Sequence, residues 1–328
     1  MKRGSLFPIF CLLTALAGPV CFAQGLEDAL KAVVKVHSLV PQDAHTAGTL
    51  GTEREGSGVV IDSKGHILTI GYLIVEAETV EVVGAGGSSV EATLVGYDHE
   101  TGFGLVKARK PLGVKPVKLG ASGSLDVGDP VLVAGYGGAE PAQGAFVVRR
   151  MEFVAPWEYL LEDAIVTLPA YPNFGGAALI GRDGRLLGIG SLLTHVPVPE
   201  VGSMLCNIFV PIDLLHPILE DLMAGRARKA PRPWLGISSD EAHGRVFVTQ
   251  VTPGGPAERA GLKEDDLVMA VNGKAVTGLA DFYRKVWALG DAGVEVVMTV
   301  LRGTETREVK VRSADRNRFL LRKPEPPI

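Results

Sequence analysis

Short apolar runs, separated by turns that contain glycine and aspartate, dominate the first two thirds of the chain. Clear examples are residues 58–61, 80–83, 92–96, 130–134 and 185–189. Turn signals such as Asp-Ser-Lys-Gly at 62–65 and Arg-Asp-Gly at 182–184 lie between such runs. Frequent short strands without intervening helices favour a β-barrel or sandwich over a parallel α/β sheet.

A helical pattern follows at residues 211–225. Apolar residues at 214, 215, 218, 219 and 222 fall on one stripe, which predicts an amphipathic helix that ends at Gly225. Residues 226–232, Arg-Ala-Arg-Lys-Ala-Pro-Arg, are polar and basic, and we interpret them as a solvated linker.

A second block spans residues 233–313. Its pattern predicts strands at 235–238, 245–251, 267–271, 294–301 and 304–311, a short helix at 256–260 and an amphipathic helix at 279–289. This order indicates a small α+β domain. Residues 314–328 end in a charged, proline-rich stretch, so we expect a disordered tail.

The first residues have the layout of a secretory signal peptide. A positive start, Met1-Lys2-Arg3, precedes an apolar run at 6–17, and small residues precede a cleavage point after Ala23. Cleavage after Ala17 and an uncleaved anchor helix are the alternatives. Since no later segment reaches the roughly 18 apolar residues of a membrane span, we expect an exported, periplasmic protein with no stable span once residues 1–23 are removed.

Composition narrows the function further. The 328 residues carry a net charge of −4, so no overall positive field attracts nucleic acid. Removal of the signal peptide leaves Cys206 as the single cysteine, which excludes a disulfide framework, and its apolar neighbours predict a buried, unreactive thiol. Scattered histidines and the lack of a phosphate-binding loop predict neither a metal site nor a cofactor.

The second block resembles a PDZ domain. Residues 232–237, Arg-Pro-Trp-Leu-Gly-Ile, resemble the carboxylate-binding loop of bacterial protease-associated PDZ domains, and residues 251–274 resemble the central PDZ signature. Gly236 allows backbone N–H groups to converge on a carboxylate, and the following strand edge can pair with an extended peptide. The resemblance implies a peptide groove formed by Trp234, Leu235, Gly236, Ile237, Phe282, Tyr283 and Val286.

The first block resembles the trypsin-like HtrA/Deg proteases. The matching segments are residues 56–69, 131–135, 183–189 and 209–213, and the order of a protease block followed by a PDZ domain also matches. The resemblance implies a mainly β chain in which two packed six-stranded barrels, within residues 24–225, precede the α+β PDZ domain. That family cleaves peptides with a histidine, an aspartate and a serine.

The motifs that carry this triad have lost all three residues. The histidine motif, Thr-Asn-(Ala or Asn)-His-Val-Val, corresponds to Thr-Ile-Gly-Tyr-Leu-Ile at 69–74, which places Tyr72 at the histidine. The aspartate motif corresponds to 102–107 and places Gly102 at the acid. The serine motif corresponds to Pro-Asn-Phe-Gly-Gly-Ala-Ala-Leu at 172–179 and places Gly175 at the nucleophile.

These substitutions predict an inactive protease fold, because a phenol that titrates near pH 10 is a poor base at neutral pH and glycine has no reactive side chain. Nearby replacements would have to come from His99, Glu100, Thr167, Tyr171 or Ser191, and we expect His99 to be exposed in a turn.

The sequence therefore predicts an exported pseudoprotease that binds extended peptides or C-termini of exported proteins and acts as an adaptor, chaperone or regulator. The alternative is a serine-type endopeptidase of periplasmic protein quality control with a non-standard site. The resemblance further implies a homotrimer or co-assembly with an active relative.

Overall fold

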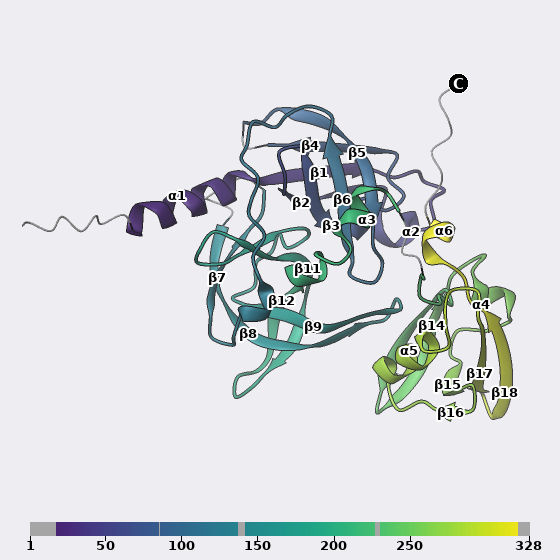
Figure 1. Ribbon diagram of the computed structural model, residues 1–328. Helices are drawn as coiled ribbons and strands as arrows, with labels where there is room; N and C mark the ends of the chain where they lie inside the picture. The colour runs from purple at the N-terminus through teal and green to yellow at the C-terminus, as the bar shows by residue number, and fades with distance from the viewer. Residues whose placement is uncertain (1–17, 85, 137–141, 227–229, 321–328) are drawn as a thin grey trace, which may run out of the picture.

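The computed structural model describes residues 18–84, 86–136, 142–226 and 230–320 (Figure 1). The predicted signal peptide lies mostly outside these residues, and α1, Gly18–Lys31, is the first described helix. Among the described helices, none is long and apolar enough to cross a membrane. The predicted cleavage after Ala23 stays a prediction.

Six antiparallel strands close the first barrel in the order β1-β2-β3-β6-β5-β4. The strands are β1 Val33–Leu39, β2 Glu53–Val60, β3 His66–Ile70, β4 Thr79–Val83, β5 Ser89–Tyr97 and β6 Phe103–Ala108. The short helix α2, Ala47–Leu50, lies between β1 and β2, and the 3-10 turn η1, Gly71–Leu73, follows β3. Strand β3 contains three branched apolar residues, and all five of its residues are buried, as expected for a strand inside a closed barrel.

A second closed barrel has the order β10-β11-β12-β9-β8-β7. Its strands are β7 Pro130–Ala134, β8 Ala142–Ala155, β9 Tyr159–Leu168, β10 Ala178–Ile180, β11 Leu186–Val198 and β12 Gly202–Pro211, and the 3-10 turn η2, Ser122–Ser124, precedes them. One continuous cluster of buried apolar residues extends through both barrels, so the two pack directly against each other. Strands β8 and β9 form a long hairpin that reaches the C-terminal domain (Figure 1).

The C-terminal domain is a mixed unit with its own core. Its sheet runs β13-β14-β15-β17-β18, with β16 paired to β15. The elements are β13 Ile237–Ala242, β14 Arg245–Val251, α4 Pro256–Arg259, β15 Leu267–Val271, β16 Lys274–Ala275, α5 Leu279–Trp287, β17 Glu295–Arg302 and β18 Glu305–Arg312. Four buried residues at i, i+3, i+4 and i+7 turn one face of α5 to this core: Leu279, Phe282, Tyr283 and Val286.

The predicted architecture, two six-stranded β-barrels followed by an α+β domain, is confirmed. Cys206 is fully buried, as predicted, and burial raises the pKa of its thiol.

The helix predicted at 211–225 is interrupted. The structure has a 3-10 turn η3, Ile212–Leu214, and a separate helix α3, Leu219–Met223. Pro217 explains the break, because proline has no N–H to donate and its ring clashes with the preceding turn. The apolar stripe still packs, since Leu215 is fully buried and Leu222 is nearly so.

The tail predicted to be disordered from residue 314 is ordered up to residue 320. Ala314 pairs with Trp234 in an isolated bridge, and α6, Arg316–Leu320, follows. The ring of Phe319 lies 4.7 Å from the Trp234 ring, centroid to centroid. Residues 319 and 320 are apolar, and their packing explains the order of α6. The charged, proline-rich residues 321–328 lie outside the described part.

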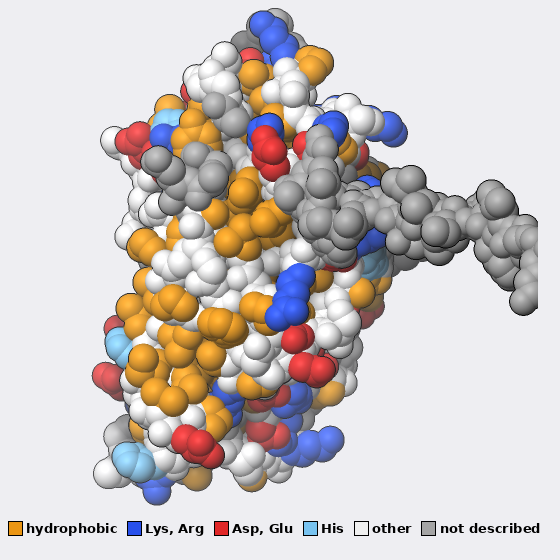
Figure 2. All heavy atoms as spheres, turned by 90° about the vertical axis from the view of Figure 1, so that its left-hand side faces the viewer, with side chains coloured by type: hydrophobic (Ala, Val, Ile, Leu, Met, Phe, Trp, Pro, Cys, Tyr) orange, Lys and Arg blue, Asp and Glu red, His pale blue; other side chains and the backbone are white. Residues whose placement is uncertain are grey.

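One face of the molecule gathers hydrophobic side chains. Figure 2 shows them over the middle of the face seen on the left of Figure 1, with charged side chains mostly around them. The second barrel exposes several large apolar residues, among them Val127, Phe146, Met204 and Leu205. Contiguous apolar surface is typical of contacts with other molecules.

Candidate functional site

A buried arginine holds the turn that carries Tyr72. This residue lies in η1, directly after β3. Arg54 in β2 is only 4% exposed, and its Nη1 donates to the carbonyls of Tyr72 and Val75, both at 2.9 Å. Because a buried guanidinium requires acceptors for its N–H groups, these contacts fix the backbone at the position expected for histidine.

The Tyr72 phenol reaches from the first barrel to the second. Its Oη donates to the carbonyl of Ser191 in β11 at 3.0 Å. A Cβ placed on Gly175 would lie 2.9 Å from the same Oη, so the phenol stands where a side chain at 175 would begin. Burial raises the pKa of Tyr72 above its usual value near 10. The phenol is therefore protonated at neutral pH and cannot accept a proton from a nucleophile.

The turn at Gly175 and Gly176 is fixed at the junction of the barrels. The carbonyl of Gly175 accepts from the Ser57 amide at 2.8 Å, and the Gly176 amide donates to the Gly190 carbonyl at 2.9 Å. Gly176 has a φ of +73°, and a Cβ there would lie 1.9 Å from the Ser57 carbonyl oxygen. Glycine is therefore required at 176 on both conformational and steric grounds.

Gly102 joins this region through the backbone. Its carbonyl accepts from the Gly71 amide at 2.7 Å, which places it beside the turn of Tyr72. Its φ is +84°, and a Cβ there would meet the Tyr159 hydroxyl at 3.1 Å. That hydroxyl donates to the carbonyl of Thr101 at 2.7 Å. The structure thus brings the three degenerate positions together, and an aromatic ring borders the place where an acid would stand.

Three of the possible replacement groups belong to the second barrel and have other surroundings. Thr167 is fully buried. The hydroxyl of Tyr171 accepts from the Gly135 amide at 3.1 Å. Ser191 is nearly buried, and its carbonyl accepts from the phenol of Tyr72. Among the described residues no hydrogen bond joins any two of these three side chains, so they form no relay for proton transfer.

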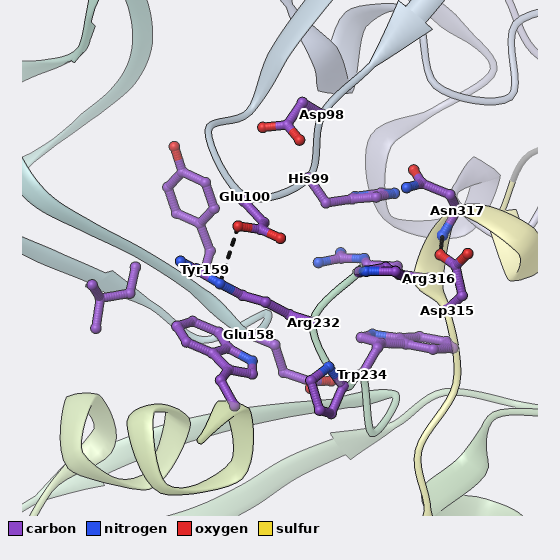
Figure 3. A pocket seen from close by; sticks show the side chains of 14 residues that line it. Asp98, His99, Glu100, Glu158, Tyr159, Arg232, Trp234, Asp315, Arg316 and Asn317 are labelled. Carbon is purple, nitrogen blue, oxygen red and sulfur yellow. Dashed lines mark hydrogen bonds and ion pairs between the residues drawn. The ribbon is translucent and has the colours of Figure 1, made fainter. Parts of the chain in front are cut away.

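The other two, His99 and Glu100, face the C-terminal part of the chain. The expectation that His99 is exposed is wrong: both ring nitrogens are buried, and the ring lies 4.2 Å from that of Tyr97. Burial, and then the nearby Arg316 guanidinium, lower the pKa of His99 well below 6.5. Glu100 pairs with Arg232 Nε at 3.1 Å. These side chains line a pocket of about 50 Å³ between the first barrel, β9 and the C-terminal domain (Figure 3).

The loop predicted to bind a carboxylate contacts a carboxylate of the same chain. Glu158 lies in the turn between β8 and β9, and its Oε1 accepts from the amides of Gly236 at 2.8 Å and Ile237 at 3.2 Å. Its Oε2 accepts from the Leu235 amide at 2.9 Å. Gly236 has a φ of +77°, which turns the three N–H groups towards one point. Burial raises the pKa of Glu158, while the three amides and Arg316 act in the opposite direction.

Of the α5 residues predicted for the groove, two belong to the domain core and one contacts the β8–β9 turn. Phe282 and Val286 are buried within the core of the C-terminal domain. Tyr283 is also buried, but its Oη accepts from the Glu158 amide at 3.2 Å and lies 3.0 and 2.7 Å from the carbonyl oxygens of residues 155 and 156. Burial raises the pKa of Tyr283. The hydroxyl therefore stays protonated and binds the backbone of the β8–β9 turn.

Trp234, the first residue of the predicted loop, is only 6% exposed. Its amide donates to the Ala314 carbonyl at 3.1 Å, and its carbonyl accepts from the Ala314 amide at 2.9 Å. The indole packs beside Phe319 of α6. The C-terminal segment therefore packs against the loop. The sequence did not predict this contact, because residues 314–328 were expected to be disordered.

Comparison with known proteins identifies the family. A model described as a trypsin-like peptidase domain matches residues 56–189, and one described as a PDZ domain matches residues 233–312. The Arabidopsis thaliana protein named Protease Do-like 1, chloroplastic, is 31% identical over 311 residues, which cover 87% of this chain and 70% of that protein. The chain belongs to the HtrA/Deg family.

Bacterial members of the HtrA/Deg family match as well. The Haemophilus influenzae protein named probable periplasmic serine protease do/HhoA-like is 30% identical over 275 residues, 78% of this chain and 57% of that protein. The Escherichia coli periplasmic pH-dependent serine endoprotease DegQ is 27% identical, over 78% of this chain and 58% of its own length. The chain thus spans slightly less than six tenths of these two relatives.

Solved structures of the HtrA/Deg family share the fold. The structure titled HtrA-type protease AlgW with decapeptide has a TM-score of 0.54 and 21% identity, and the match covers 90% of this chain and 98% of that one. The serine endoprotease from Yersinia pestis has a TM-score of 0.52 and 24% identity, with 90% and 97% covered. At these identities the likeness establishes the fold alone.

Sequence reasoning about this HtrA/Deg chain missed Glu158. It stands in Ala-Pro-Trp-Glu-Tyr at 155–159, where a charged residue between two strands is typical of an exposed turn. Its partners follow almost eighty residues later, and only the placement of the hairpin against the C-terminal domain brings them together. The one local signal was the pair of bulky aromatic residues that flank it, which is unusual for a solvent-exposed turn.

Proposed function

We propose that this member of the HtrA/Deg family is an exported pseudoprotease that binds peptides or protein C-termini through its PDZ domain. The observation that carries the proposal is the phenol of Tyr72, which stands 2.9 Å from a Cβ placed on Gly175 and donates to the second barrel. At that position an active enzyme needs a base facing a nucleophile.

The groups that remain near the three triad positions are not expected to hydrolyse a peptide bond. Without a triad, oxyanion stabilisation and binding retain only about 10³–10⁴-fold acceleration over water, which is far too little for hydrolysis of a peptide bond on a biological timescale. The groups nearest to the three positions are phenols whose pKa is raised by burial, Tyr72 and Tyr159. Neither can act as a general base near neutral pH.

Peptide binding is supported by the loop at 235–237. Its three amides converge on one carboxylate, which is how a backbone nest holds the C-terminal carboxylate of a partner. A fold neighbour is titled as a complex with a decapeptide. We therefore propose Trp234, Leu235, Gly236 and Ile237, with Tyr283 of α5, as the groove, whereas Phe282 and Val286 support it from the core.

Location and assembly form the rest of the proposal. The names of the bacterial relatives, together with the predicted signal peptide, support export to the periplasm of a mature chain with a barrel block at 24–225, a linker at 226–232 and a PDZ domain at 233–313. The apolar face in Figure 2 supports a homotrimer or co-assembly with an active relative. Light scattering on the purified protein, alone and mixed with such a relative, tests this part.

The decisive experiment is a protease assay. Purified protein is incubated with casein and, separately, with a fluorophosphonate probe, beside an active HtrA/Deg protease as the positive control. We expect neither cleavage nor labelling. Cleavage that a single substitution in this chain abolishes would refute the proposal and favour a serine-type endopeptidase with a non-standard site.

A further inference from the structure

The carboxylate of Glu158 makes the contacts that the loop offers to a ligand. Oε1 accepts two backbone N–H groups and Oε2 accepts the third, at 2.8 to 3.2 Å. Glu158 is 8% exposed, so these bonds are shielded from water. Backbone N–H groups that converge on one carboxylate form strong, charge-assisted hydrogen bonds. A terminal carboxylate has the same two oxygens and needs the same three donors.

The backbone next to Glu158 also follows the groove. The amide of Ser239 in β13 donates to the carbonyl of Pro156 at 2.9 Å, on the edge of β13 that does not pair with β14. Across the groove, Tyr283 of α5 lies within hydrogen-bond distance of the same carbonyl, at 2.7 Å. The turn at 156–158 therefore lies between β13 and α5. An added peptide strand is held by the same two kinds of contact, to a sheet edge and to a carboxylate loop.

Further contacts hold the turn in place. Glu158 has a φ of +57°, a left-handed conformation that residues with a Cβ adopt only when their surroundings favour it. Arg316 Nη1 donates to the Trp157 carbonyl at 3.0 Å, and Arg284 of α5 forms an ion pair with Glu152 of β8. These contacts, before and within the turn, hold the segment in the groove.

We propose that the β8–β9 turn is an internal ligand of the PDZ domain, in which the side-chain carboxylate of Glu158 takes the place of a partner's C-terminal carboxylate. This inference rests on the proposed peptide-binding function and adds its regulation. A partner peptide binds only after the turn has left the groove, so the PDZ domain is closed in the free protein. No covalent change is needed, because the incoming carboxylate accepts from the same three backbone N–H groups that the Glu158 carboxylate releases.

The expected change in peptide affinity depends on the fraction of molecules whose groove is closed by the β8–β9 turn. When only a fraction of the molecules has an open groove, the apparent dissociation constant equals the intrinsic constant divided by that fraction. If about one molecule in ten or fewer is open, removal of the internal carboxylate raises the apparent affinity about tenfold or more. The substitution Glu158→Ala tests this, because it deletes the carboxylate and leaves the loop at 235–237 intact.

Glu200→Ala is the matched control. Glu200 also lies in a hairpin turn with a left-handed backbone, at a φ of +63°, but it is exposed at the end of the β11–β12 hairpin. The probes are short fluorescent peptides with randomised C-terminal residues, each made with a free carboxylate and as an amide. Fluorescence anisotropy measures their affinity for the full chain. We expect tighter binding of the free-carboxylate peptides to Glu158→Ala, and no change for Glu200→Ala or for the amides.

A second readout does not depend on any peptide. Hydrogen exchange of the amides at 235–237 is measured in the wild-type chain and in both variants, with exchange in the core strand β17 as the check that each variant is folded. Protection that is lost in Glu158→Ala and kept in Glu200→Ala supports the internal ligand. All three tryptophans, at 157, 234 and 287, lie in or near this contact, so their fluorescence reports release of the turn as well.

The outcomes separate the two proposals. Equal exchange at 235–237 in wild type and Glu158→Ala overturns the internal ligand, and so does measurable peptide binding that is equally tight in the two proteins. If Glu158→Ala loses amide protection yet binds no free-carboxylate peptide, the internal ligand stands and the proposed peptide-binding function fails.

Discussion

Replacement of Gly175 by serine would return a nucleophile to the degenerate site. A Cβ at this position would lie 2.9 Å from the Tyr72 hydroxyl, closer than such contacts normally allow, so the phenol has to move. Its movement breaks the 3.0 Å hydrogen bond to the Ser191 carbonyl. We expect Gly175→Ser to lower the free energy of unfolding by about 1 kcal/mol, the typical net contribution of one such bond.

The restored hydroxyl should nevertheless stay unreactive. Burial raises the pKa of Tyr72, so the phenol beside the new serine holds its proton at neutral pH. In a triad hydrolase, loss of the base alone lowers kcat by about 10⁶-fold, as much as loss of the serine. The double change Tyr72→His with Gly175→Ser supplies a base without an orienting acid and should remain about 10⁴-fold below a complete triad.

Reaction with a fluorophosphonate probe, followed by gel fluorescence, measures the outcome. Gly144→Ser is the control, because it is the same substitution at an exposed strand position with open space around its Cβ. We expect equal, background labelling of both single variants, and an unfolding midpoint in urea that falls only for Gly175→Ser. Labelling of Gly175→Ser at the rate of an active HtrA/Deg protease would show that Tyr72 or another group acts as a base, and would refute this reasoning.

Two further predictions concern stability. Asp266 is fully buried and accepts from Arg302 at 2.6 and 2.7 Å, so Asp266→Asn should lower the unfolding free energy in urea by about 2–3 kcal/mol. Because the pKa of Asp266 lies below 3.8, this difference should persist above that pH and shrink as the pH falls further. Burial, and then Arg316, lower the pKa of His99, so the packing of the His99 ring against the C-terminal segment should weaken as the pH falls below 6.5. Tryptophan fluorescence can follow this change, and His99→Gln should remove it.

Much of the fold and the loss of the triad could be predicted because both depend on local patterns. Strands such as β6 and β10 are apolar runs between turns, and nearly all of their residues are buried whichever neighbour they pair with. The replacements at 72, 102 and 175 stand inside motifs, so their positions follow from a few flanking residues. Pro217 is also a local signal, because a proline interrupts a helix. The prediction of one continuous helix followed the apolar stripe on both sides of Pro217 and overlooked it.

Contacts between distant segments could not be predicted in the same way. Glu158 and His99 both occur in turns between strands, where isolated charged or titratable residues are normally solvated. Each is buried because the C-terminal domain and α6 pack against the barrels at that point, and no spacing within the sequence determines that arrangement. The order of α6 has the same cause, since Phe319 gains its packing from Trp234 and His45, which are far from it in sequence.

The region of Gly175 and the loop of residues 235–237 are both occupied by a side chain of this chain, but they differ in what remains available to a ligand. At Gly175, the Tyr72 phenol occupies the space beside the position predicted for the nucleophile, and glycine has no reactive side chain that a movement could expose. At the loop of residues 235–237, Glu158 occupies donors that remain intact, and a carboxylate from a partner can bind the same donors once the turn moves. Changes at Tyr72 should therefore leave peptide affinity unaltered, and changes at Glu158 should leave the outcome of the casein assay unaltered. On both proposals, we expect a ligand to change the state of this protein at the loop of residues 235–237 and not at Tyr72 and Gly175.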